Sequence, residues 1–233
     1  MVEKLVVGGD PRIEARVRRS AQARRLSLRV SRLDGRVTLS IPRAVPIREA
    51  EAFLRDRAAW LRQVLAEQPA AVTVGPGVCL PVGSDRVLVS AVARGPARLE
   101  EGQLFVRATR PAGPQVAAVL RARAKTLLEP ACRRYSARIG RVPGRISLRD
   151  TRSRWGSCTE AGNLMFSWRL AMAPEPVLDY VAAHEVAHLR EMNHSSRFWA
   201  LVRQLCPEFE RYRGWLHAHG AALHRYRFDG GDG

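Results

Sequence analysis

His184, Glu185 and His188 form an H-E-x-x-H motif, and His194 follows six residues later. Residues four apart on an α-helix lie on one face, so the first two imidazoles can bind one metal ion. Glu185 lies beside them and is well placed to take a proton from a metal-bound water, which makes it the candidate general base. The motif therefore predicts a helix that carries a metal site on one face.

His194 is the candidate third ligand, and it requires a turn in the chain. An uninterrupted helix would carry His194 about 15 Å along its axis from His184. We therefore expect the helix to end between them, with Asn193 in the left-handed conformation that often ends a helix. Three histidines leave a fourth position open for water, as in catalytic zinc sites. Nickel, copper or iron would also accept imidazole ligands, and a chance cluster of histidines is the alternative to a metal site.

Length and segment composition limit the class of protein. A chain of 233 residues can form one large domain or two small ones with a core that needs no disulfides. Residues 1–10 lack a secretory pattern, and no apolar segment reaches about 18 residues. These features predict a cytoplasmic protein with no membrane association.

The net charge of +17 permits two interpretations. A basic face would attract nucleic acid, nucleotides or other polyphosphates. Alternatively, the arginines are spread over solvated surfaces. The second interpretation is favoured because no compact basic run with interleaved aromatic residues occurs.

The first half of the chain is predicted to be mainly β with one helix. Alternating apolar residues over 13–41, with Asp34-Gly35 as the turn, predict a hairpin. Residues 46–65 have helical spacing, with an apolar stripe that includes Trp60. Short strands are expected around residues 72–74, 79–82, 86–92 and 103–108.

Pro111-Ala112-Gly113-Pro114 interrupts this pattern. We therefore predict a β-rich region over residues 1–110, a catalytic domain over 111–228 and a disordered tail over 229–233.

The second half is predicted to combine helices with a small sheet. A long helix over 115–139 should end at Gly140. Strands over 145–149 and 164–170 should frame a loop over 151–163. The metal helix should begin at Pro174-Glu175-Pro176, and Ser195 should cap the helix that follows it. The fold class is α+β.

Several segments resemble one known family. They are Arg154-Trp155-Gly156-Ser157-Cys158, Asp179-Tyr180-Val181, the metal helix, Asn193-His194-Ser195 and Phe198-Trp199, and, in the first half, residues 24–30 and the helix ending near Trp60. Together they resemble the YgjP-like metal-dependent hydrolases, relatives of the SprT and WLM groups of zincin-type metallopeptidases. The resemblance implies zinc on His184, His188 and His194, with Glu185 as the base. It also implies a zincin-like catalytic domain in which a strand beside the metal helix offers its edge to an extended peptide.

Three further residues are candidates for substrate binding. The resemblance places the 154–158 loop near the cleft, where Arg152 and Arg154 could stabilise an oxyanion or hold a carboxylate or phosphate. Alternatively, Arg154 and Trp155 only fix the loop. Tyr180 lies one turn before His184, where it could orient a ligand, bind substrate or simply pack.

The leading hypothesis is a zinc-dependent hydrolase, a metallopeptidase that acts on peptides or proteins. One alternative is a zinc-dependent hydrolase of nucleotide phosphoanhydrides (a pyrophosphatase), with the same metal and a basic pocket around Arg152 and Arg154. The absence of a glycine-rich phosphate loop weakens it. Another is a nucleic-acid-associated protein of the SprT type, recruited by its basic surface.

Overall fold

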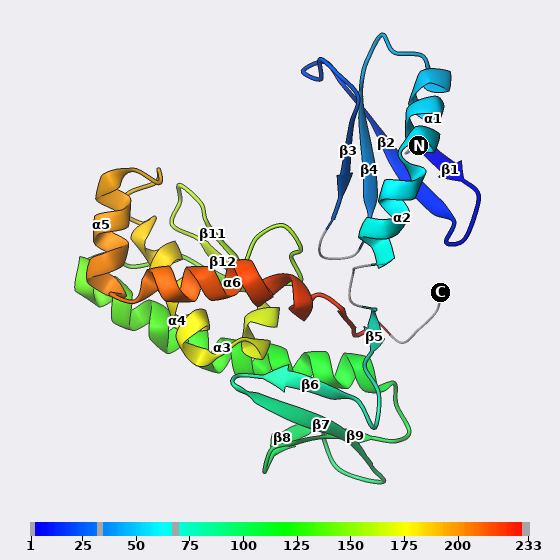
Figure 1. Cartoon of the computed structure of the whole chain (residues 1–233). Coiled ribbons are helices and arrows are strands. Elements are labelled where there is room, and N and C mark those ends of the chain that lie inside the picture. The colour runs from blue at the N-terminus through cyan, green and yellow to red at the C-terminus, as the bar shows by residue number, and fades with distance from the viewer. Residues whose placement is uncertain (1–2, 32–34, 67–69, 230–233) are drawn as a thin grey trace. The chain divides into compact units, whose positions relative to one another are not determined.

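The computed structural model describes residues 3–31, 35–66 and 70–229 of an α+β protein (Figure 1). The chain forms two compact units, Met1–Ala71 and Val72–Gly233. The boundary predicted between residues 110 and 111 falls inside the second unit, because the strands before it share one core with the helices after it. Leu104 and Leu120, which lie on either side of that position, are both fully buried in this core. Among the described residues, no helix is long and apolar enough to cross a membrane.

The first unit is a four-stranded sheet with two helices. Its elements are β1 (Lys4–Val7), β2 (Ile13–Ser20), β3 (Ser27–Val30), β4 (Val37–Pro42), α1 (Ile47–Asp56) and α2 (Ala58–Ala66). The strand order is β1-β2-β4-β3; β2 and β4 are parallel, and the two outer pairs are antiparallel. Successive side chains of a strand face opposite sides, so Ile13, Ala15 and Val17 are buried while Arg16 and Arg18 are exposed.

The predicted hairpin corresponds to β3 and β4, which pair antiparallel. Of its predicted turn, Gly35 has a φ of 67°, whereas Asp34 lies outside the described residues. The single helix predicted over 46–65 is wrong: α1 ends at Asp56 and α2 begins at Ala58, because Arg57 leaves the helical conformation with φ −92° and ψ 3°. Trp60, predicted to lie in the apolar stripe, is 46% exposed.

The second unit contains another four-stranded sheet. Its elements are β6 (Cys79–Val82), β7 (Asp85–Val92), β8 (Arg98–Glu100), β9 (Gln103–Arg107) and the following helix α3 (Ala112–Ile139). The order is β6-β7-β9-β8, and only β7 and β9 are parallel. The sheet and α3 contribute to one hydrophobic core. Gly140 ends α3 in the left-handed conformation, as predicted, and Pro130 lies inside the helix without ending it.

A smaller sheet follows α3 in the second unit. It contains β10 (Ile146–Arg149), β12 (Leu164–Ser167) and β11 (Gly156–Cys158), in that order, with β11 at one edge. The predicted loop over 151–163 therefore contains a strand. The strand predicted to reach Leu170 ends at Ser167 and continues as the 3₁₀ turn Trp168–Met172. All five residues of that turn are buried, and a short apolar run does not distinguish a buried turn from a buried strand.

Three helices complete this unit: α4 (Glu175–Ala187), α5 (Ser196–Leu205) and α6 (Phe209–Leu223). Pro174 is the N-cap of α4, and Ser195 caps α5 by accepting a hydrogen bond from the Phe198 backbone N–H at 3.4 Å, as predicted. The short strands β5 (Val72–Thr73) and β13 (Tyr226–Arg227) pair in parallel. Residues 230–233 of the predicted disordered tail lie outside the described residues.

Candidate metal centre

Helix α4 carries the H-E-x-x-H motif and is buried along most of its length. Its position is fixed from α3: Asp179 accepts hydrogen bonds from the Arg134 guanidinium and from the Tyr135 hydroxyl. Arg123 of α3 also pairs with Glu175 in the first turn of α4. Hydrogen bonds to a charged partner are stronger than neutral ones, so these contacts hold α4 in a defined position along α3.

The three predicted histidines come together. One ring nitrogen from each of His184, His188 and His194 lies within 4.8 Å of the others. The Nε2 atoms of His184 and His194 are 3.2 Å apart. Two nitrogens bound to one tetrahedral zinc at about 2.0 to 2.1 Å would lie about 3.3 Å apart. The cluster therefore has the spacing of a site that could hold a metal ion.

The rings are oriented by contacts outside the cluster. The Nδ1 atom of His188 lies 3.0 Å from the Glu191 carbonyl oxygen. Because a carbonyl oxygen can only accept, Nδ1 carries the proton and donates it. The Nε2 atom of the neutral ring is then unprotonated and faces the cluster. Nδ1 of His184 is buried and has no hydrogen-bond partner in the described parts of the chain. Its ring is held by packing instead, with ring centroids 4.9 Å from Phe198 and 5.9 Å from Tyr180.

Burial keeps two of the histidines neutral. It lowers the pKa of His184 to about 3, and the nearby His188, His194 and Arg213 charges lower it further. Burial also lowers the pKa of His188, against the effect of the Glu191 hydrogen bond. Metal binding requires unprotonated imidazole, so both rings are in the binding form at neutral pH.

The turn that brings His194 back differs from the predicted one. Helix α4 ends at Ala187, and the N–H groups of Leu189 and Arg190 donate to the carbonyls of Val186 and Ala187 in tighter, three-residue turns. Asn193 does not take the left-handed conformation; among the described residues, only Glu101 combines a side chain with positive φ. The helix thus ends directly at the second ligand, which shortens the return to His194.

Glu185 lies against the edge strand of the small sheet. A Cβ atom built on Gly156 of β11 would be 2.5 Å from Glu185 Oε1, so the carboxyl group occupies space that only glycine leaves free. Its side chain is 5% exposed. Burial raises the pKa of Glu185 to about 8, and the charge of Arg154 opposes that rise. A pKa raised toward the working pH suits a group that takes and returns a proton.

Beside this carboxylate lies a pocket of about 360 Å³. Two of the predicted substrate-binding residues, Arg154 and Tyr180, line it together with His184 and Glu185. The phenol of Tyr180 stays protonated, because burial raises its pKa to about 12. Arg152 is exposed and does not line the pocket. The Trp155 ring packs against Gly220 and His224 of the C-terminal segment, a contact expected under the sequence alternative in which Arg154 and Trp155 only fix the loop.

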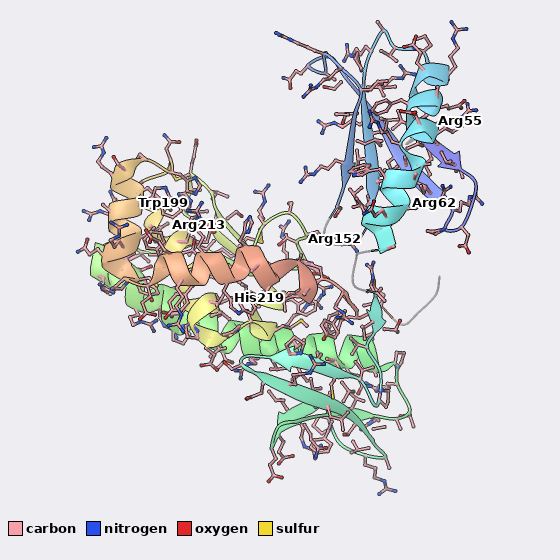
Figure 2. The ribbon with its side chains drawn as sticks, in the orientation of Figure 1. Arg55, Arg62, Arg152, Trp199, Arg213 and His219 are labelled. Atoms are coloured by element: carbon pink, nitrogen blue, oxygen red, sulfur yellow. The ribbon has the colours of Figure 1, made fainter. Side chains whose placement is uncertain are left out.

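Two lining residues, Arg213 and His217, were not predicted. They lie one turn apart on α6, about 20 positions along the chain from His194, the last predicted ligand. Their four-residue spacing puts them on one face of α6, but nothing local to that helix shows that this face lies beside His184. Figure 2 shows Arg213 next to Trp199 of α5, and its guanidinium carbon is 4.8 Å from the centre of that indole ring.

The buried Arg169 fixes the position of α6. It pairs with Asp150 through two hydrogen bonds of 2.7 and 3.1 Å. A third nitrogen donates to the carbonyls of Leu223 and Tyr226 at 3.0 Å each. Arg169 therefore joins the end of β10 to the end of α6, which forms one wall of the pocket.

Of three comparisons with known proteins, only the one with family models found a match. Searches of curated proteins and of solved structures found no match. The model of the YgjP-like family, described as a metallopeptidase domain, matches residues 24–219. The match covers well over half of the chain and contains the whole histidine cluster with Glu185. The chain therefore belongs to the YgjP-like family of metallopeptidase domains.

Proposed function

We propose that this protein is a zinc-dependent peptidase in which His184, His188 and His194 hold the metal. The donor set supports zinc, because three histidine ligands that leave a fourth position for water are typical of catalytic zinc. When bound, zinc would supply Lewis acidity and activate water at neutral pH. Glu185 would take the proton from that water and deliver it to the leaving amine.

The observation that carries this proposal is the contact between Glu185 and Gly156. Strand β11 pairs with β12 on one side, and no other described strand pairs with its outer edge. An extended peptide could add to that edge through backbone hydrogen bonds. Because Glu185 packs directly against β11, a peptide bound there would pass beside the proposed base and the histidine cluster.

Tyr180 and Arg154 are then candidates to bind the substrate. The Tyr180 phenol is protonated at neutral pH and can donate a hydrogen bond to a carbonyl oxygen. Arg154 lies close enough to influence the pKa of Glu185 and lines the same pocket. These two side chains would position the peptide and offset negative charge that develops during attack.

The test is peptide cleavage by zinc-loaded wild type and Glu185→Gln, with a mixed peptide library read by mass spectrometry. We expect the variant to bind zinc normally and to lose about 10²- to 10⁴-fold in cleavage rate, the usual contribution of a general base. Glu160→Gln, a change to an exposed residue between β11 and β12, is the matched control and should keep full activity. Full activity in Glu185→Gln would overturn the assignment.

Phosphoanhydride hydrolysis is the second candidate, and the basic lining of the pocket is the observation that favours it. Arg154 and Arg213 both line the pocket beside Glu185, and arginine binds phosphate well. The same zinc-loaded protein should be incubated with nucleoside triphosphates. Release of pyrophosphate or phosphate that depends on Glu185, without cleavage of any peptide, would select this function instead.

A further inference from the structure

We propose that the pocket beside the histidine cluster is a carboxylate-binding subsite formed by Arg154, Arg213 and His217. This inference deepens the proposed peptidase function and rests on it. The carboxylate would belong to the substrate residue next to the cleaved bond. It would be either the C-terminal carboxylate of the peptide or an acidic side chain.

The donors and the apolar surface of the pocket are arranged for an amino acid residue. Arg154 comes from the loop before β11, and Arg213 and His217 come from α6, so basic groups enter from two different elements. Trp155, Val181 and Leu216 supply apolar lining. Such a pocket can bind a charged group and an apolar side chain together.

The two arginines lack acidic partners of their own. Neither Arg154 nor Arg213 forms an ion pair in the described ranges of the chain, although both are exposed. Their neighbours behave differently: on α6, Arg211 pairs with Glu208 at 3.2 Å, and on α5, Arg203 pairs with Glu210 at 2.9 Å. Two unpaired guanidinium groups that line one pocket indicate an anionic ligand.

The wall that carries Arg213 is preformed. Its guanidinium lies over Trp199, whose ring centroid is also 5.7 Å from that of His194. At the other end of α6, a Cβ atom on Gly220 would be 2.9 Å from Trp155, so the helix packs closely on the loop that presents Arg154. Trp199 thus links Arg213 to the histidine cluster. An anion bound to Arg213 would therefore lie at a defined place beside the histidine cluster.

Charge and lining favour a carboxylate over a polyphosphate. A carboxylate carries one negative charge and matches the planar guanidinium in a two-bond contact. A nucleoside triphosphate carries several negative charges, and the lining includes no lysine.

The test measures binding to the zinc-loaded, full-length Glu185→Gln protein, which should not cleave its ligand. The probes are acetyl-Ala-Ala-Phe as the free acid, the same peptide as its C-terminal amide, and the amide with aspartate in place of phenylalanine. Each peptide is titrated into the Glu185→Gln protein, and binding is followed by NMR. The titrations are repeated with Glu185→Gln proteins that also carry Arg213→Ala, Arg154→Ala or Arg211→Ala. Arg211→Ala is the matched control, because Arg211 lies on the same helix outside the pocket.

We expect at least one carboxylate-bearing peptide to bind about tenfold or more tightly than the phenylalanine amide, as charge-assisted hydrogen bonds predict. Arg213→Ala and Arg154→Ala should each reduce that preference to less than about threefold, while Arg211→Ala keeps it. If only the free acid binds more tightly than the phenylalanine amide, the ligand is the C-terminal carboxylate. If the aspartyl amide binds as tightly as the free acid, the subsite also accepts an acidic side chain. Equal binding of all three peptides, or a preference that survives Arg213→Ala in a folded variant, would overturn the proposal. Inorganic phosphate is titrated in the same way, and tighter binding of phosphate than of either carboxylate-bearing peptide would also overturn the proposal.

Repeating the titration without zinc separates this inference from the proposed function. If the preference persists but the zinc-loaded wild type cleaves no peptide, the peptidase proposal fails and the carboxylate subsite stands. If peptides are cleaved with no dependence on a carboxylate or on Arg213, the subsite fails and the peptidase proposal stands.

Discussion

Two segments of the molecule, β1 to α2 and β6 to α3, share one chain topology. In each, four strands form a sheet in which the second and fourth strands are parallel and the outer pairs are antiparallel, and a helical segment follows. The similarity lies in the pairing of the strands. The same arrangement thus occurs once in each compact unit.

The helical segments that follow the two sheets differ. In the first unit, the chain breaks at Arg57, and α1 spans only 10 residues. In the second, α3 continues for 28 residues, and Figure 1 shows it extending past the sheet toward α4. Arg134 and Tyr135, near its C-terminal end, hold Asp179 of α4. The extension of this helix supports the candidate site.

The buried residues of the two units also differ. The described buried polar and charged side chains all belong to the second unit: Ser136, Ser167, Arg169, Glu185, His188 and His224. The first unit buries apolar residues. Burying polar groups costs free energy unless they are paired, so their restriction to one unit indicates where the chemistry lies. The following changes test this contrast.

Arg169→Met should have the largest effect on stability. It leaves two buried carbonyls without their donor, each at a cost of about 1–3 kcal/mol, and removes the ion pair with the half-exposed Asp150, so we expect a loss of about 3–5 kcal/mol in the free energy of unfolding. Chemical denaturation of wild type and variant measures it. Arg203→Ala, which removes an exposed pair, is the control. A loss below about 1 kcal/mol would show that Arg169 does not hold α6.

Leu39→Ala tests the apolar unit. Leu39 is fully buried in β4, so the change should cost about 2–5 kcal/mol by leaving a cavity. Hydrogen exchange read by mass spectrometry should show faster exchange in β2 and β4 and unchanged exchange in α4. Loss of protection in α4, or loss of metal, would contradict the separation of the two units.

Asp179→Asn tests the link between α3 and α4. The change weakens hydrogen bonds from a guanidinium and a phenol to a partly exposed carboxylate, so we expect a loss of about 1–2 kcal/mol. The zinc affinity should fall together with the stability. Competition with a zinc chelator measures that affinity. Glu129→Gln, which removes the carboxylate of an exposed pair with Lys125 on α3, should change neither quantity. Unchanged zinc affinity in Asp179→Asn would mean that α3 does not support the site.

Arg29→Ala should have the smallest effect. Arg29 lies on the exposed face of the first sheet, so we expect a change within about 0.5 kcal/mol and no change in peptide cleavage. Thermal unfolding and the peptide assay measure both. A clear loss of cleavage would connect this basic face to the reaction.

Local spacing allowed part of the site to be predicted. His184 and His188 face one way because they are four residues apart on a helix, and the distance to His194 required a turn. The resemblance to the YgjP-like family, drawn from short motifs, is confirmed by the match over residues 24–219.

The other parts of the site depend on contacts between distant segments. Gly156 leaves room for Glu185, although it lies 29 positions earlier in the chain. Strand β11 was predicted to be part of a loop, because a strand of three residues is too short to show an alternating pattern. Arg213 and His217 reach the pocket through the packing of α6, which Arg169 and Trp155 determine. The break at Arg57 had no proline or glycine to mark it.

Metal content is the most direct test of the central claim that the three histidines hold a catalytic metal. Elemental analysis of untagged protein should give about one zinc per chain in the wild type and little in His188→Ala. His219→Ala is the matched control, because His219 stacks on Trp215 outside the cluster and its loss should leave the zinc in place. Full zinc in His188→Ala, or no zinc in the wild type even after zinc is added, would contradict the account.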